Sequence, residues 1–225
     1  MILVFFLKQE IRTDEVHVTL STPLTVTPGA AGSGYTPLLT LAAQNHLPIG
    51  IVQRSGLDPI CKRTVAFDHE AISLGELVLL LRKRWPESEI DVKNGVLTIK
   101  PKGIVSTETE RFLGLKLPSF DSVTSTHNEL GIALWMHIRS VVRPGEGTMF
   151  AGSTPMNSEK LDGMHIRNET VEEILDEIVK KGTGGVWIFK SSEIVQMSKL
   201  NKLPYYVYGL SDNPKYLATS LSCGK

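Results

Sequence analysis

Apolar residues recur at helical spacing in two stretches of the first half of the chain, and each stretch predicts an amphipathic helix. The first begins at Thr36, a potential N-cap followed by a proline at the first helical position. The second follows Ser73, which forms the pattern of a capping box with Glu76 three residues later. Alternating or β-branched runs predict strands at 16–20, 49–52, 63–67, 89–92 and 96–99. The pair Asn94-Gly95 predicts a tight hairpin turn between the last two strands.

The second half of the chain shows the same alternation of helices and strands. One helix is predicted after Thr126 or Asn128, either of which can serve as its N-cap. Another follows Thr170, again with a glutamate, Glu173, three residues later. Strands are predicted at 113–120, 161–167 and 186–189. The polar stretch 103–111 is predicted to be a linker between the halves.

The two halves align with each other as an internal repeat. A shift of 97 residues places Ser73 on Thr170 and Ile90 on Trp187, and a shift of 92 aligns the earlier helices. We therefore predict an α+β fold of two tandem small modules, each with two helices packed on short β-strands, followed by a tail strand. The predicted segments are an N-terminal strand or signal remnant at 1–15, a first module at 16–103, a second module at 112–192 and a tail at 193–225.

These residues also carry a resemblance to a known family. The first half contains Pro37-Leu-Leu-Thr-Leu-Ala-Ala-Gln-Asn-His46, Ile72-Ser-Leu-Gly-Glu-Leu77 and Ile90-Asp-Val-Lys-Asn-Gly-Val-Leu-Thr-Ile99. It resembles the secretin and TonB N-terminus short domain, in which a first helix ends in a polar residue and a turn, and a leucine-rich second helix precedes a hairpin. The second half looks like a degenerate copy without the Asn-Gly turn. The resemblance implies a protein-interaction module of the bacterial cell envelope and supplies no catalytic residues.

Composition and charge narrow the classes of function. Of the 225 residues 41% are hydrophobic and 21% charged, which is typical of a chain that folds around a core. The sequence has 24 lysine and arginine residues and 24 aspartate and glutamate residues. It therefore lacks the excess of basic residues that is typical of nucleic-acid-binding proteins. We expect no nucleic-acid partner.

The cysteines and the N-terminus bear on the cellular compartment. Cys61 and Cys223 lack the spacing of a zinc site, and they form either one disulfide or two free thiols. The apolar run within 1–7 is too short for a membrane span and has no basic residue before it, so it is a signal remnant or a first strand. We expect no transmembrane span and a periplasmic or secreted location, with the cytoplasm as the alternative.

The polar residues of the sequence match no catalytic or metal-binding motif that we considered. The glycines of 29–34 have the spacing of neither a dinucleotide site nor a P-loop, and this stretch is predicted to be a flexible loop. No His-Glu-x-x-His pattern occurs among the histidines. Charged residues of the last predicted helix are expected to form a solvated face: Glu172, Glu173, Asp176, Glu177, Lys180 and Lys181. We therefore assign no catalytic residue, metal ligand or cofactor.

Tyrosines gather in the tail. Four of the five lie within the last 21 residues, and a strand is predicted at 205–210. Tyrosine combines a large contact area with a polar tip and is common at protein interfaces. The strand is either an ordinary edge strand packed on the second module or a surface for a partner. Tyr205, Tyr206 and Tyr208 are the candidate contacts with a partner.

Three classes of function remain. The sequence and the resemblance favour a non-enzymatic protein-interaction module of the cell envelope that binds a protein partner. The alternatives are a binder of a small ligand or peptidoglycan fragment in a cleft between the modules, and a hydrolase-like enzyme with its site between the repeats.

Overall fold

The computed structural model describes residues 18–27, 31–53, 59–67, 70–103, 107–142, 159–190 and 205–209. The helices are α1 (Thr36–Asn45), α2 (Leu74–Arg84), α3 (Thr107–Leu113), α4 (His127–Val142), α5 (Val171–Lys180) and the 3₁₀ turn η1 (Pro59–Lys62). The strands of the first half are β1 (Pro23–Thr25), β2 (Ala31–Ser33), β3 (Ile49–Gln53), β4 (Thr64–Ala66), β5 (Ala71–Ser73), β6 (Ser88–Lys93) and β7 (Val96–Pro101). Those of the second half are β8 (Lys116–Ser122), β9 (Met164–Thr170), β10 (Gly185–Lys190) and β11 (Tyr205–Gly209). The fold is mixed α and β, which agrees with the predicted α+β class.

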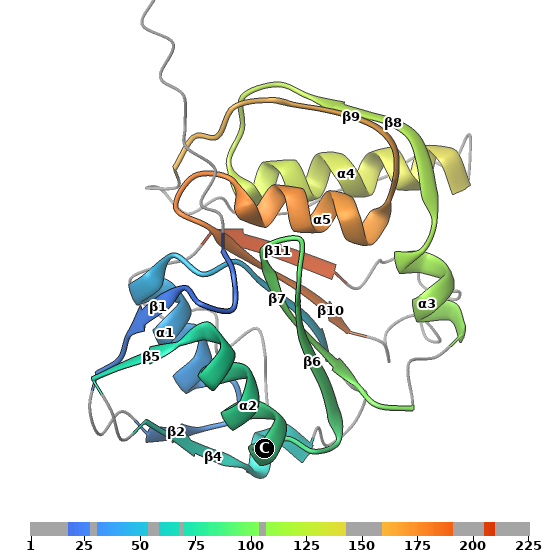
Figure 1. The fold of residues 1–225 in the computed structure, drawn as a ribbon. Helices are drawn as coiled ribbons and strands as arrows, with labels where there is room; N and C mark the ends of the chain where they lie inside the picture. The colour runs from blue at the N-terminus through green and yellow to red at the C-terminus, as the bar shows by residue number, and fades with distance from the viewer. Residues whose placement is uncertain are drawn as a thin grey trace, which may run out of the picture.

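A five-stranded sheet in the order β11-β10-β3-β7-β6 runs through the middle of the molecule (Figure 1). Strands β10, β3 and β7 are parallel, whereas the edge strands β11 and β6 are antiparallel to their neighbours. Strands β3, β7 and β6 come from the first half of the chain, and β10 and β11 come from the second. Both halves therefore contribute to one sheet.

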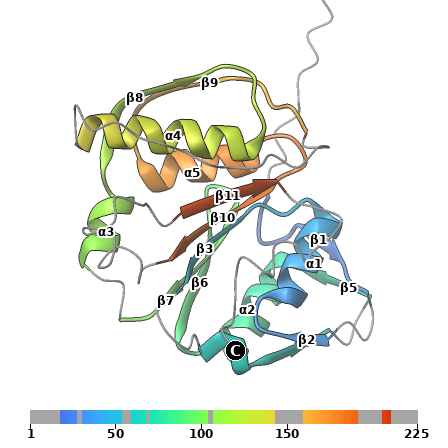
Figure 2. The same ribbon diagram turned by 180° about the vertical axis from the view of Figure 1, so that it is seen from behind.

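Each face of this sheet is covered by a pair of helices, and two-stranded ladders cover the helices, β1–β5 and β2–β4 on one side and β8–β9 on the other (Figures 1 and 2). Helices α1 and α2 lie between the sheet and the β1–β5 ladder, and α4 and α5 lie between the sheet and the β8–β9 ladder. Side chains along β3 alternate between the two faces of the sheet. Ile49 and Ile51 belong to the buried cluster on one face, and Val52 belongs to the buried cluster on the other. The molecule therefore has two hydrophobic cores on opposite faces of a shared sheet.

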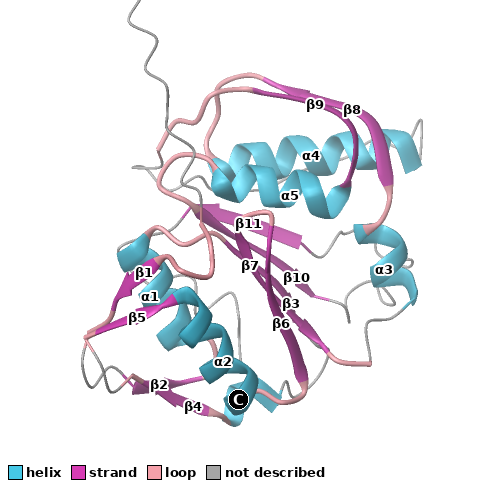
Figure 3. Ribbon diagram, in the orientation of Figure 1, coloured by secondary structure: helices cyan, strands magenta, loops and turns pink. Residues whose placement is uncertain are grey.

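Capping boxes begin three of the helices. Ser73 and Glu76 form the predicted box at α2, and Thr170 and Glu173 form the predicted box at α5. At α4 the cap is Thr126, whose hydroxyl accepts from the Glu129 N–H while the Glu129 carboxylate accepts from the Thr126 N–H. Because the caps of α2 and α5 have extended backbone, strands β5 and β9 run into these helices without a loop (Figure 3).

Several predicted segments were wrong. Residues 18–22 form a turn instead of a strand, and the rest of the predicted strand 16–20 lies outside the described residues. The first described strand is β1, at a position where no strand was predicted, and β2 lies inside the glycine-containing stretch that was predicted to be a flexible loop. The predicted linker 103–111 contains the start of α3, because Leu113 is buried and the Phe112 ring stacks on Phe189 at 5.3 Å between ring centres. Packing against the second core makes this polar stretch helical.

The β6–β7 hairpin and the packing of β10 on β3 each require particular residue types at certain backbone positions. Asn94 and Gly95 both have positive φ, 53° and 78°, as the predicted tight turn between β6 and β7 requires. Gly50 on β3 pairs with Trp187 on β10, and a Cβ atom at Gly50 would lie 2.3 Å from Cζ2 of the indole. The absence of a side chain at Gly50 therefore lets the indole lie across β3.

We expect Gly50→Ala to destabilise the protein by about 1–3 kcal/mol or more, because the new methyl group overlaps the indole. Urea unfolding of the single variant, of Trp187→Leu and of the double variant measures the coupling. Alanine at position 50 should cost much less in the Trp187→Leu background. An equal cost in both backgrounds would show that the indole is not the reason for glycine here.

Candidate functional site

The two edges of the central sheet are the candidate interaction sites. An edge strand has backbone groups without a neighbour, and an extended segment of another chain can pair with them. Among the described residues, β11 pairs only with β10, and β6 pairs only with β7. These edges lie at opposite ends of the sheet.

The β11 edge contains the tyrosines singled out in the sequence. Its backbone pairs Tyr206 with Ile188 and Tyr208 with Val186, whereas Tyr205 pairs with Phe189. Ile188 and Val186 belong to the first core and Phe189 to the second. The register thus places Tyr206 and Tyr208 at positions of one face and Tyr205 at a position of the other. Helix α4 runs alongside this strand (Figure 2).

The β6 edge has outward-facing backbone groups at Ser88, Ile90 and Val92. In a hairpin with a two-residue turn, the residues on either side of the turn, here Lys93 and Val96, form a hydrogen-bonded pair. Hydrogen-bonded pairs then alternate with pairs that are not hydrogen-bonded, so every second residue of β6 points its N–H and C=O away from β7. Ser88 donates its N–H to the Trp85 carbonyl at 2.9 Å. Within the described chain, no group pairs with the Ser88 carbonyl, the Ile90 N–H or the Val92 carbonyl.

Two charged side chains cover other groups of the β6 edge. Arg82, at the end of α2, donates from Nε to the Ile90 carbonyl at 2.8 Å. Asp91 accepts from the Val92 N–H at 2.9 Å, and its carboxylate lies 3.7 Å from the Arg82 guanidinium. Both side chains are at least half exposed. Charged side chains of this kind protect natural sheet edges against unwanted pairing.

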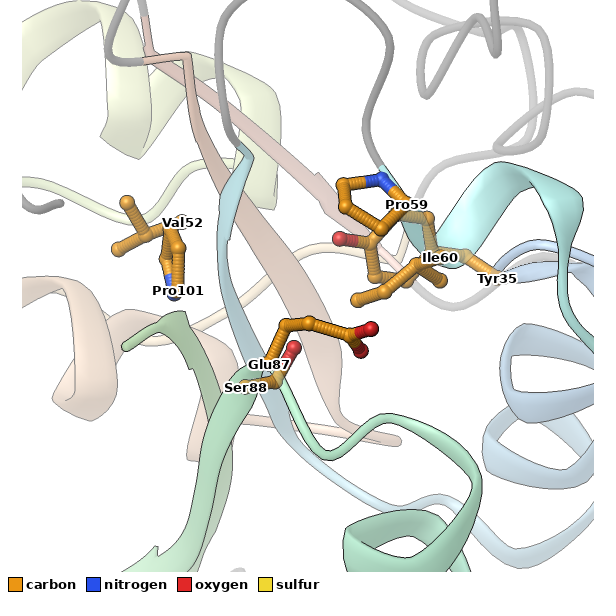
Figure 4. Close-up of a pocket in the computed structure, with 7 residues that line it drawn as sticks. All are labelled: Tyr35, Val52, Pro59, Ile60, Glu87, Ser88 and Pro101. Atoms are coloured by element: carbon orange, nitrogen blue, oxygen red, sulfur yellow. The ribbon is translucent and has the colours of Figure 1, made fainter. Parts of the chain in front are cut away.

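A small depression lies beside the other end of β6 (Figure 4). It is lined by Tyr35, Val52, Pro59, Ile60, Glu87, Ser88 and Pro101 and has room for about one water molecule. Glu87 points its carboxylate toward Ile60 and accepts from Arg63 at 2.5 Å. The depression is too small for a sugar or peptide fragment.

Asp176 is buried, which corrects its assignment to a solvated helix face. Only 2% of the residue is exposed, and its Oδ1 accepts a 2.8 Å hydrogen bond from Nε1 of the fully buried Trp187. Burial raises the pKa of Asp176 to about 7, although the hydrogen bond from Trp187 acts in the opposite direction. No local pattern predicts this burial, because the residue opposite Asp176 is known only once α5 packs on β10.

A second buried titratable group lies at the start of α4. His127 is 4% exposed, and its Nε2 has no hydrogen-bond partner. Burial lowers the pKa of His127 to about 4, so the ring is neutral at physiological pH. The structure thus places this histidine in the interior.

Charged groups on the β8–β9 ladder are exposed to solvent. Asp121 accepts hydrogen bonds from Arg167 at 2.8 Å and from His165 at 2.9 Å, and these bonds hold the pKa of Asp121 below its usual value. This trio lies on the outer surface, so we interpret it as a surface ion-pair network. Over the described ranges no three His, Cys, Asp or Glu residues are grouped as metal ligands would be.

No family model, no curated protein and no solved structure matches this chain. In the described part, every helix is too short or too polar to cross a membrane.

The raised pKa of Asp176 predicts how stability depends on pH. The folded protein binds this proton more tightly than the unfolded chain, so stability falls as the pH rises from about 4 to about 7 and is then constant. Asp176→Asn keeps an acceptor for Trp187 and has no charge, so above pH 7 the variant should be more stable than wild type, by up to about 4 kcal/mol.

Thermal or urea unfolding of both proteins between pH 4 and pH 8 measures this difference. His127 contributes a slope of opposite sign between about pH 4 and 6.5, but it is present in both proteins and cancels in the comparison. A difference between wild type and Asp176→Asn that does not grow with pH would contradict the assignment of a protonated buried carboxyl.

Proposed function

We propose that this chain is a non-enzymatic protein-interaction protein of the bacterial cell envelope that binds a protein partner. The observation that carries the proposal is the shared sheet, whose two edge strands each pair with a single neighbour among the described residues; one of them is the strand of Tyr205, Tyr206 and Tyr208. Edge strands accept strands from partners, and tyrosines are frequent anchors of interfaces.

We infer further that the two halves are tandem copies of one module similar to the secretin and TonB N-terminus short domain. The order of elements supports this inference, since α1 ends in Asn45 and a left-handed turn at His46, and the leucine-rich α2 precedes the β6–β7 hairpin. In the second half, β8, α4, β9, α5 and β10 follow in the matching order. The proposed equivalents Leu77 and Ile174 are both fully buried.

A periplasmic or secreted location is part of the proposal. Cys61 is disulfide-bonded, and the sequence contains one other cysteine, Cys223, which lies outside the described residues. Disulfides persist mainly in oxidising compartments, so this bond favours the envelope over the alternative, the cytoplasm.

The other classes of function have less support. A binder of a small ligand or peptidoglycan fragment would need a cleft between the modules, but β3 and β10 pair directly there. A hydrolase-like enzyme would need converging polar side chains open to a substrate, and Asp176, which has a strongly raised pKa, is packed against Trp187.

Crosslinking followed by affinity purification from the native cell envelope tests the proposal. We expect a protein partner to be recovered with the wild type, and at least one of Tyr205→Ala, Tyr206→Ala and Tyr208→Ala to weaken binding by more than about 1 kcal/mol without lowering the melting temperature. The matched Tyr→Phe variants keep the ring and should bind nearly normally.

Substitution of a single histidine, such as His165→Gln, should leave partner recovery unchanged, because no titratable group performs chemistry in this account. Recovery only from the cytoplasm, without a partner, would contradict the proposal. If the three alanine variants unfold and none changes binding alone, the tyrosines are structural and the partner surface lies elsewhere.

A further inference from the structure

We propose that Lys100, Glu172 and Asp176 form a proton-dependent switch at the junction between the two halves of the chain. While Asp176 is protonated, Lys100 on β7 pairs with Glu172 in the first turn of α5. When Asp176 loses its proton, Lys100 moves to it, one turn further along the helix. The switch does not depend on the proposed function, because it needs no partner.

The three side chains lie together where α5 packs on the sheet. Nζ of Lys100 lies 2.5 Å from Oε1 of Glu172, and the two side chains are 27% and 16% exposed. Glu172 and Asp176 are four residues apart on α5, and this spacing makes them neighbours on one face of the helix. Lysine carries its charge on a flexible four-carbon chain. Lys100 can therefore exchange one carboxylate for the other without a movement of the backbone.

Asp176 is the group of the switch that changes its charge. The structure pairs each of the two nearby cations with another carboxylate, Lys100 with Glu172 and Lys180 with Glu177. A buried carboxyl beside cations that are already paired holds its proton to a higher pH, in agreement with the pKa of about 7 for Asp176. Once ionised, the buried carboxylate is stabilised by a cation, and Lys100 is the cation that acts on it most strongly.

Uncharged groups line the sheet side of Asp176. Trp187 on β10 donates its indole N–H to the carboxyl, and it keeps this bond after ionisation because a carboxylate is the stronger acceptor. Strand β3, which also contacts α5, has only uncharged residues over Ile49–Gln53. The sheet strands under this turn of α5 thus offer Lys100 as the cation for Asp176.

Charged groups on the other elements around α5 have smaller effects on Asp176. The largest charge effects come from Glu172, Lys100 and Lys180, in that order. Lys180 follows Asp176 by one turn, but it pairs with Glu177 and lies against Gly95 in the β6–β7 turn. The elements next to α5 carry these further charged or titratable residues: Lys93, Glu110, Arg111, His127, Arg139 and Glu169.

The two states differ in which turn of α5 is tied to the first half of the chain. Strand β7 belongs to the first half and α5 to the second. The protonated state ties β7 to the start of α5, whereas the ionised state ties it to the turn that holds the Trp187 indole over Gly50. A change in pH near neutrality thus redistributes the polar contacts of the junction while the chain stays folded.

A double-mutant cycle of Lys100→Met and Glu172→Gln in the full chain, measured at pH 5.5 and at pH 8.5, tests the switch. Urea unfolding of the four proteins gives the coupling between the two side chains at each pH. At pH 5.5 we expect a coupling of about fivefold in the unfolding equilibrium constant, as for a favourable ion pair that is partly exposed. At pH 8.5 the coupling should fall below about twofold, because Lys100 then pairs with Asp176.

Two control cycles separate the switch from general effects of pH. In the Asp176→Asn background the coupling of Lys100 with Glu172 should be the same at both pH values, because position 176 no longer titrates. The cycle of Lys180→Met and Glu177→Gln should also give equal couplings at both pH values, because this pair stays together.

Side-chain NMR of the wild-type protein gives a second measurement that does not depend on the stability of variants. The indole N–H resonance of Trp187 and the Cε resonance of Lys100 should shift together, with one midpoint near pH 7.

Three results would overturn the switch: equal coupling of Lys100 with Glu172 at the two pH values, loss of the Lys180–Glu177 coupling in its place, or a Lys100 resonance that does not titrate with that of Trp187. Loss of the Lys100–Glu172 coupling at pH 8.5 in the Asp176→Asn background would show that Asp176 does not control it. Absence of any partner in the envelope crosslinking would contradict the proposed function and leave the switch standing.

Discussion

The parallel pairing of β3 with β10 is the contact on which the rest of the structure depends. It joins strands from the two halves of the chain, and it requires Gly50 because the Trp187 indole occupies the space of a side chain there. Trp187 in turn donates to Asp176 and so ties α5 to the sheet. Lys100 on β7 pairs with Glu172 on α5 at 2.5 Å, which adds a polar link between the halves. Gly50 and Trp187 thus join the two halves within the sheet, and Asp176 ties the same indole to α5.

This junction determines which strands lie at the edges of the central sheet. Because β10 occupies the side of β3, the sheet continues across both halves and ends at β11 and β6. Helices cover both faces of the sheet, and in the described part of the chain each edge strand pairs with one neighbour only. Our functional proposal assigns partner binding to the tyrosine-bearing strand β11 at one of these edges. The position of this proposed binding surface is therefore a consequence of how the halves join.

Local patterns in the sequence were sufficient for much of the fold. These patterns predicted the capping boxes at Ser73 and Thr170, the Asn94-Gly95 turn and strand β11. Each of these features depends on neighbouring residues or on simple periodicity. The helix at α3 was missed because its stability comes from packing on Phe189. The burial of Asp176 and the contact of Arg82 with Ile90 also depend on long-range packing. The candidate edges could not be identified before the order of the strands was known.

Fluorine NMR of the full chain labelled with 5-fluorotryptophan tests most directly whether the two halves form one cooperative unit. The chain has three tryptophans. Trp85 lies in the first core and Trp187 in the second, and Trp135 packs against the second core, so each half carries a probe. If the shared sheet couples the cores, the folded resonances of Trp85 and Trp187 should disappear at the same urea concentration in a single transition. Separate midpoints, with one folded resonance surviving the loss of the other, would contradict the account.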